Sequence, residues 1–218
     1  MFNQTPDLEP QPPPPGNAAI IRQWLTLAIC LFALGWLMHR YFDRVPAPPP
    51  GIIVSEDPQQ ALINHGKPII LKSYTLTPIA SFTIRARVLS VEYYTSGRDA
   101  ELSPVDFAVG WGSMSDSAVI DKISISQDGR WYYINYDGPP PIRNDLMITH
   151  SHNVHIIPAN DEIEKILMDV RKNNIIDMQG YLVSVTGADN FQWVSSLTLD
   201  RQGPHTCKLM LLEKIKIE

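Results

Sequence analysis

The chain has 218 residues, with 18 Lys and Arg against 23 Asp and Glu, and a formal net charge of −5. Its larger, C-terminal part is long enough to form one domain with a hydrophobic core. That part is acidic and lacks clusters of Lys or Arg. This composition argues against binding to nucleic acid and against electrostatic docking on anionic lipid.

Residues 18–38 are the longest apolar stretch and are predicted to form one uncleaved transmembrane helix. Arg22 lies close enough to one end for its side chain to reach the lipid headgroups. Trp24 and Trp36 lie near the two ends, where indole rings favour the membrane–water interface, and Arg40 follows shortly after. Together these residues define the expected membrane anchor.

Proline-rich segments flank the predicted anchor. Residues 1–17 are expected to be a disordered tail, because they cannot bury apolar surface. Residues 39–51 are expected to be a juxtamembrane collar and a stiff linker that holds the domain off the bilayer. The remaining residues, 52–218, are predicted to be one β-rich soluble domain.

Two observations conflict over the orientation of this anchor. Arg40 and Arg44 after the helix, against Arg22 alone before it, would place the domain in the cytoplasm. In contrast, Arg22 followed by a short apolar run and a proline spacer has the form of an uncleaved export signal. We favour a single-pass protein of a bacterial inner membrane with a periplasmic domain, and the cytoplasmic side is the alternative.

Alternating apolar residues predict that the domain is mainly β. Residues 80–88 alternate cleanly, and the apolar phase changes at Leu89, which predicts a bulge there. Asp128 and Gly129 lie between two further alternating runs and predict a two-residue hairpin turn with both residues at positive φ. Extended runs are also predicted at residues 146–157, 175–185, 191–199 and 207–217.

One amphipathic helix is predicted to begin at Asn160, which is a suitable N-cap. The order strand, helix and three strands resembles a small closed barrel of the OB type, with Gly180 as a bend or bulge within a long strand. The expected fold class is mainly β (α+β), with a barrel- or sandwich-like domain. Cys30 and Cys207 are not expected to pair, and Cys207 is expected to be a small buried apolar residue.

Several short motifs occur together in the soluble domain. As a set they resemble an uncharacterised family of small membrane-anchored bacterial proteins, and the resemblance implies no activity and no cofactor. The motifs are Ser103–Asp106, Gly110–Gly112, Met114–Asp116, Ile125–Gln127, Gly129–Tyr132, His150–Asn153 and Gly180–Val183.

His150 and His152 are the strongest candidates for specific chemistry. On a strand they would share a face with Ile148, Val154 and Ile156, whereas His155 would face the other way. Two histidines at this spacing can ligate one metal ion, but a third ligand would have to come from His65, His205 or Asp145. We expect packed histidines without a bound metal, and a metal site is the alternative.

Trp131, Tyr132 and Tyr133 place aromatic rings on both faces of one predicted strand. Aromatic residues are enriched in binding surfaces, so this strand is a candidate partner surface. The other interpretation is a strand that the rest of the domain covers on both faces.

No enzymatic signature accompanies these features. Ser113, Ser115 or Ser151 could be combined with a histidine, but the Gly-x-Ser-x-Gly pattern is absent, as are Walker, dinucleotide and Cys-x-x-Cys motifs. We therefore expect a non-enzymatic binding or accessory component of a bacterial envelope complex, with other envelope proteins as partners and no cofactor. The alternatives are a ligand- or metal-binding domain that uses His150 and His152, and a hydrolase with an unrecognised site.

Overall fold

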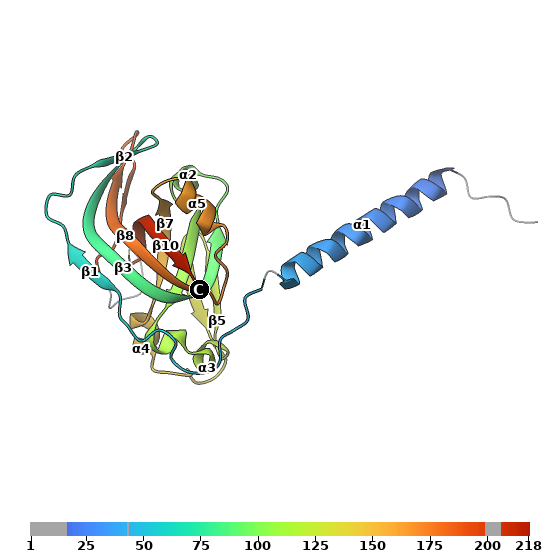
Figure 1. Cartoon of the computed structure of the whole chain (residues 1–218), viewed down its shortest axis with the longest axis horizontal. Helices are drawn as coiled ribbons and strands as arrows, with labels where there is room; N and C mark the ends of the chain where they lie inside the picture. Colours follow the sequence, from blue (N-terminus) through green and yellow to red (C-terminus); the bar gives the residue numbers. More distant parts are fainter. Residues whose placement is uncertain (1–16, 43, 199–205) are drawn as a thin grey trace, which may run out of the picture. The chain divides into compact units, whose positions relative to one another are not determined.

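The computed structural model describes residues 17–42, 44–198 and 206–218, as an N-terminal apolar helix and a sheet-rich domain (Figure 1). The chain divides into two units, residues 1–44 and residues 45–218, which are treated separately below. Apart from Asn17, the tail predicted at residues 1–17 lies outside the described residues.

Helix α1 spans Asn17–Phe42 and is therefore longer than the 18–38 segment predicted. Within it, Ile20–Met38 is long and apolar enough to cross a membrane, by length and composition. All side chains of this stretch are exposed, including those of Arg22, Trp24 and Trp36. A helix with apolar side chains exposed on all sides is typical of a segment that lies in lipid or against another chain.

Five strands of the domain close into a ring (Figure 1). Neighbouring pairs β3–β4, β4–β7, β10–β8 and β8–β3 are antiparallel, and β7–β10 is parallel. Because the long, curved β3 pairs with both β4 and β8, the ring has no open edge between its first and last strands. The strands are β3 (Tyr74–Tyr93), β4 (Val105–Gly110), β7 (Ser151–Pro158), β8 (Ile175–Thr186) and β10 (Lys208–Ile217).

Shorter elements surround this barrel. Two strands add to β3 and one adds to β8; they are β1 (Gln59–Leu62), β2 (Ile69–Leu71) and β9 (Gln192–Val194). A separate hairpin is formed by β5 (Ser124–Asp128) and β6 (Trp131–Asn135). The helices are α2 (Arg98–Leu102), η1 (Gly112–Ser115), α3 (Ser117–Ile120), α4 (Asn144–Thr149) and α5 (Asp161–Leu167).

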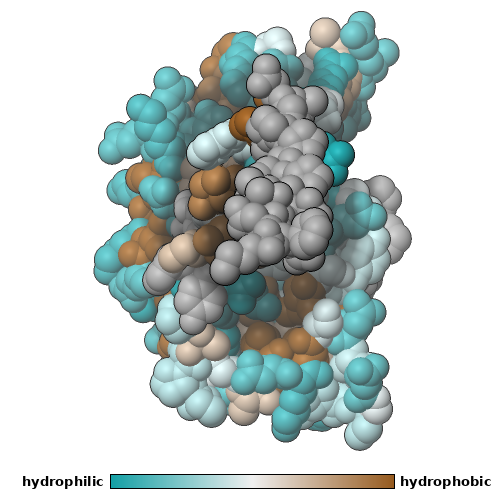
Figure 2. Space-filling model, turned by 90° about the vertical axis from the view of Figure 1, so that its right-hand side faces the viewer, coloured by the Kyte–Doolittle hydropathy of each residue, from teal (hydrophilic) through white to brown (hydrophobic). Residues whose placement is uncertain are grey.

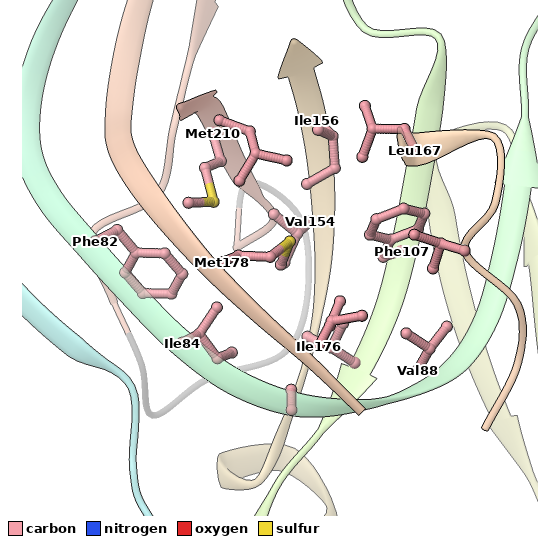
Figure 3. Packing of buried hydrophobic residues seen from close by; sticks show 14 of the residues in the cluster. Phe82, Ile84, Val88, Phe107, Val154, Ile156, Leu167, Ile176, Met178 and Met210 are labelled. Carbon is pink, nitrogen blue, oxygen red and sulfur yellow. The ribbon is translucent and has the colours of Figure 1, made fainter. Parts of the chain in front are cut away.

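The main hydrophobic core fills the inside of the barrel. Side chains from the curved pair β3 and β8 point toward those of β4, β7 and β10, and Leu167 of α5 joins them (Figure 3). The labelled residues from the strands are Phe82, Ile84, Val88, Phe107, Val154, Ile156, Ile176, Met178 and Met210, all nearly or fully buried. Hydrophilic residues make up most of the outline in Figure 2, with smaller hydrophobic patches between them.

The bulge predicted near Leu89 is confirmed, whereas the irregularity predicted at Gly180 lies opposite this residue, in β10. The register between β3 and β4 shifts between Val88 and Ser90, which places the bulge at Leu89. The register between β10 and β8 shifts opposite Gly180, between Leu212 and Lys214. A Cβ atom on Gly180 would overlap the carbonyl oxygen of Leu211, so the residue allows close approach of the two strands.

Three predictions of local structure are wrong in part. Residues 146–149 belong to helix α4 and not to a strand. The prediction was wrong because a short apolar run does not by itself distinguish a helix from a strand. Of the run predicted at 191–199, the described residues 191–198 contain only the three-residue strand β9 (Gln192–Val194). The N-cap at Asn160 is confirmed, since its side chain accepts a hydrogen bond from Ile163 N, but α5 is one of several short helices rather than the only helix of the domain.

The predicted hairpin exists, but its turn is one residue later than predicted. Asp128 pairs with Trp131, so the two turn residues are Gly129 and Arg130, at φ of 55° and 71°. Consecutive positive φ angles fit a turn of type I′, which matches the twist of the flanking strands. As a result Arg130 lies at the tip of the hairpin, where its side chain can reach the barrel.

Gly129→Val is expected to lower the free energy of unfolding by about 1–2 kcal/mol, the cost of a left-handed conformation for a residue with a Cβ. The effect would come from the backbone, because a Cβ on Gly129 would meet nothing within 4 Å. Urea denaturation of the full chain measures it. Ser126→Val, on an exposed position of β5, is the control, and equal stability of the two variants would contradict the turn assignment.

Part of the expected linker packs with the domain. Ser117 Oγ donates a hydrogen bond of 2.6 Å to Pro48 O, and Gly51 N donates one of 2.8 Å to Asp116 Oδ1. Val54 is fully buried, and its carbonyl oxygen accepts a bond of 2.7 Å from Gly112 N. Residues 48–54 therefore belong to the structure of the sheet-rich domain.

Candidate functional site

Three adjacent strands bring a carboxylate, an imidazole and a thiol to one face of the sheet. Asp106 on β4 pairs directly with His155 on β7, and His155 pairs with Leu209 on β10. Cys207 precedes β10 and lies two positions before Leu209, so an extended chain directs its side chain to the same face. The register therefore places Asp106 directly beside His155, and Cys207 on the same face, two residues before the partner of His155 on β10.

The three side chains differ in burial. The Asp106 side chain is fully buried, and its Oδ2 lies 2.8 Å from Nδ1 of His155. His155 is 4% exposed, and Cys207 beside it is half-buried. The Cys207 thiol also contacts the carbonyl oxygen of Arg130, with 3.8 Å between Sγ and O. The carboxylate is thus deepest and the thiol is nearest to solvent.

Arg130 neutralises the other side of the Asp106 carboxylate. Its Nη1 donates a hydrogen bond of 2.7 Å to Asp106 Oδ1, and its Nε donates one of 2.9 Å to Asp99 Oδ2. Nη2 donates to Ser103 O at 2.9 Å, and the guanidinium carbon lies 3.6 Å from the ring centroid of Tyr94. These contacts fix the position of the guanidinium.

Asn153 links the hairpin tip to β4 from the side. Its Nδ2 donates a hydrogen bond of 3.0 Å to Arg130 O and a longer one of 3.4 Å to Asp106 Oδ2. Its Oδ1 accepts a bond of 2.9 Å from Gln127 Nε2. Burial raises the pKa of Tyr94 to about 12, so this phenol stays neutral while its oxygen accepts a hydrogen bond from Arg130 N.

The contacts of His155 favour its protonated form. Burial alone would lower the pKa of this imidazole, but the contacts with Asp106 and Cys207 outweigh burial and raise the pKa to about 9. The ring therefore carries a positive charge at neutral pH. A cationic imidazole between a carboxylate and a thiol can hold a proton and release it to a reacting group.

A cleft of about 660 Å³ opens beside His155 and Cys207. Trp193 forms part of its wall, with its ring centroid 5.0 Å from that of His155. Aromatic walls with a few polar groups at the base are typical of ligand sites. The lining residues are Asp99, Arg130, Trp131, His155, Phe191, Gln192, Trp193, Val194, Ser195, Ser196 and Cys207.

His150 and His152 do not form the pair predicted on a strand. His150 is the C-cap of α4 and His152 lies on β7, so Ile148 does not share their face. Both rings lie near Trp111, at centroid distances of 6.4 and 5.4 Å. His152 is 2% exposed, and burial, together with the charge of Lys208, lowers its pKa to about 3. It is a neutral, packed residue.

The metal-binding alternative receives no support from the residues that the structure describes. Within residues 17–42, 44–198 and 206–218, no group of three or more His, Cys, Asp or Glu side chains could hold a metal ion. His205, one of the ligands considered, lies outside these ranges.

The aromatic side chains of β6 point alternately to its two faces, as predicted. Trp131 and Tyr133 are exposed, at 39% and 49%, and Trp131 lines the cleft. Tyr132 faces the other way and packs against a hydrophobic cluster. Its hydroxyl donates a hydrogen bond of 3.3 Å to Ser151 O. Of the five predicted binding residues, His150, His152, Trp131, Tyr132 and Tyr133, only Trp131 therefore lines the cleft.

The reasoning from sequence missed the residues at the centre of this site. Cys207 was expected to be apolar packing, and the structure places it in the cleft instead. His155 was set aside because it faces away from His152, yet that face carries Asp106. The three residues are far apart in the chain and form no local motif, and the pairing of β7 with β4 and with β10 brings them together.

Comparison with known proteins identifies no relative: no family model, no curated protein and no solved structure matches the chain. The resemblance of its motifs to a family of membrane-anchored bacterial proteins therefore stays a prediction.

Acidification is expected to destabilise the domain through His152. The pKa of His152 in the folded state, about 3, is below the ordinary value of 6.5, so stability is lost as the pH falls below 6.5. The loss at pH 5 is about 2 kcal/mol, from 1.36 kcal/mol per pH unit. Urea denaturation at pH 7 and pH 5 measures it, and His152→Gln should show a smaller difference. An identical difference in the variant would contradict the assignment.

Proposed function

We propose that this chain is a membrane-anchored ligand-binding protein, whose soluble domain holds an apolar or aromatic group in the cleft above His155 and Cys207. The observation that carries the proposal is the cleft itself, whose aromatic walls lie above a buried network of charges. Such a combination binds the apolar part of a ligand by its walls and orients it by the polar groups at the base.

The membrane location rests on helix α1. The length and apolar surface of Ile20–Met38 support a single-pass anchor, and the signal-like segment supports a bacterial inner membrane with a periplasmic domain. Alkaline phosphatase fused after Glu218 should then be active in a bacterial host. An inactive phosphatase fusion, together with fluorescence from a fused protein that folds only in the cytosol, would place the domain on the cytoplasmic side.

The strand order supports a barrel of the OB type. In the ring, the first long strand pairs with the second and fourth strands, the third and fifth strands are parallel, and α5 lies between the third and fourth. Barrels of this type bind varied ligands on one face and through adjacent loops. This analogy concerns architecture and assigns no activity.

A second candidate function is that of an accessory component of an envelope complex. The exposed rings of Trp131 and Tyr133 on the β5–β6 hairpin favour it, because exposed aromatic side chains are typical of protein interfaces. A photo-crosslinking residue in place of Tyr133 would then capture one defined envelope protein in intact cells. The same residue in place of Gln179, exposed on β8, is the control position.

Ligand binding can be tested through the indole N–H signals of the full chain in lipid nanodiscs. On titration with 4-phenylbutan-1-ol, we expect the NMR signals of Trp131 and Trp193 to shift, because both line the cleft. The signal of Trp111 should stay in place, since this residue is buried and bonded to another part of the domain. Shifts confined to Trp24 and Trp36 would show partition into lipid and would contradict the proposal.

A further inference from the structure

Cys207, His155 and Asp106 are arranged in the order of a thiol nucleophile, its base and a residue that orients the base. Oδ2 of Asp106 lies 2.8 Å from Nδ1 of His155, and His155 and Cys207 both line the cleft. Such constellations are recognised by geometry and roles, and the order of the residues in the chain varies between folds.

We infer that the cleft is the active site of a thiol-dependent acyl transfer, with Cys207 as nucleophile and His155 as general acid and base. Asp106 is a positioning residue, which holds the imidazole in its orientation. This inference rests on the proposed function, because the substrate must first bind in the same cleft.

The reaction balances with an ester as substrate and water as acceptor. The sulfur of Cys207, as thiolate, attacks the carbonyl carbon, and the carbon–oxygen bond to the alcohol breaks while His155 gives its proton to the leaving oxygen. This step leaves an acyl thioester and a neutral imidazole. Water then attacks the thioester and gives a proton to His155, and the carbon–sulfur bond breaks to release the carboxylic acid and restore the thiolate.

The walls of the cleft select the acyl group. Phe191 and Trp193 provide apolar surface beside His155, which suits an aliphatic or aromatic acyl chain. The two cations at the base are both paired within the domain: Arg130 donates through Nε, Nη1 and Nη2 to Asp99, Asp106 and Ser103, and His155 Nδ1 lies 2.8 Å from Asp106 Oδ2. The site therefore fits a neutral ester with an apolar acyl group rather than an anionic one.

Acylation of Cys207 can be measured on the full chain in nanodiscs. The background variant is Cys30→Ser, because Cys30 in α1 is the other cysteine of the chain. With 4-nitrophenyl 4-phenylbutanoate, we expect a burst of nitrophenolate and an acyl adduct, found by intact mass and mapped to the peptide that contains Cys207. Cys207→Ala in the same background should show neither.

The role of His155 is tested by His155→Gln, which should slow acylation by about 100-fold, the usual contribution of a general acid–base group. His65→Asn, at an exposed histidine outside the cleft, is the matched control and should react like the background protein. Asp106→Asn should alter the pH profile of acylation, because it removes the charge beside His155. Thermal unfolding of each variant shows whether it is folded.

The outcomes separate this inference from the proposed function. Shifts of the Trp193 indole with 4-phenylbutan-1-ol, but no adduct with the ester, would leave the binding function standing and overturn the acyl transfer. Equal acylation rates for the background protein and a folded His155→Gln would also overturn it, since the thiol would then react without its base. If neither the Trp193 shift nor the acyl adduct were observed, both the proposed function and the acyl transfer would be overturned.

Discussion

Asp106→Ala is expected to lower the free energy of unfolding by about 3–5 kcal/mol, the usual cost of removing one partner from a buried ion pair. The fully buried carboxylate lies between Arg130 and His155, at 2.7 and 2.8 Å. Without it, two positive charges face each other with little solvent to screen them. Urea denaturation of the full chain at neutral pH measures the change.

Asp99→Ala is the matched control, because Asp99 pairs with the same guanidinium but has a side chain that is 45% exposed. Exposed ion pairs contribute about 0–1 kcal/mol, so this variant should be close to the native protein in stability. If Asp106→Ala cost no more than Asp99→Ala, the buried network would not stabilise the domain as described.

The second large effect is expected at Gly180. Gly180→Val should lower the free energy of unfolding by roughly 3 kcal/mol or more, because the added Cβ would overlap the carbonyl oxygen of Leu211 on β10. Relief would require the backbones of β8 and β10 to separate at the bulge between Leu212 and Lys214. Thermal and urea denaturation of the full chain measure the loss.

Gln179→Val is the control for this substitution. Gln179 is the neighbouring residue on the same strand, and its side chain is exposed, so valine there should fit the sheet. Equal stability of the two variants would contradict the close approach of β8 and β10 at Gly180.

Much of the fold could be predicted from local pattern. The alternation in β3, the bulge at Leu89 and the glycine opposite the irregularity of β10 follow from a period of two and from the space that glycine leaves free. The closing pairs, β3 with β8 and β7 with β10, could be anticipated only by analogy, because strand neighbours far apart in the chain leave no periodic signal.

The errors have local physical causes. An Asp-Gly pair is the commonest signal for a two-residue turn, yet the hairpin pairs Asp128 with Trp131 and puts Arg130 in the left-handed region. The arginine can remain there because its side chain is bonded to Asp106 and Asp99. Residues 146–149 are apolar enough for either a strand or a helix, and in the structure they form part of helix α4.

The site itself could not be predicted from the sequence. On β7, the face of His152 and Val154 appeared to be the informative one, but it packs inside the barrel. On the opposite face, the hairpin bonds to Ser151 and Asn153, and Trp193 packs on His155. The residues of this face therefore alternate like an exposed face although they are buried. Which residue lies beside His155 depends on the neighbours of β7 in the ring, which are β4 and β10.

The coupling of Asp106, His155 and Cys207 is tested most directly by an NMR pH titration of the His155 ring in the full chain with isotope-labelled histidine. We expect an apparent pKa of about 9, well above the ordinary 6.5, and a lower value in Asp106→Asn and in Cys207→Ser. A pKa near 6.5 in the native protein, unchanged in both variants, would contradict a coupled site.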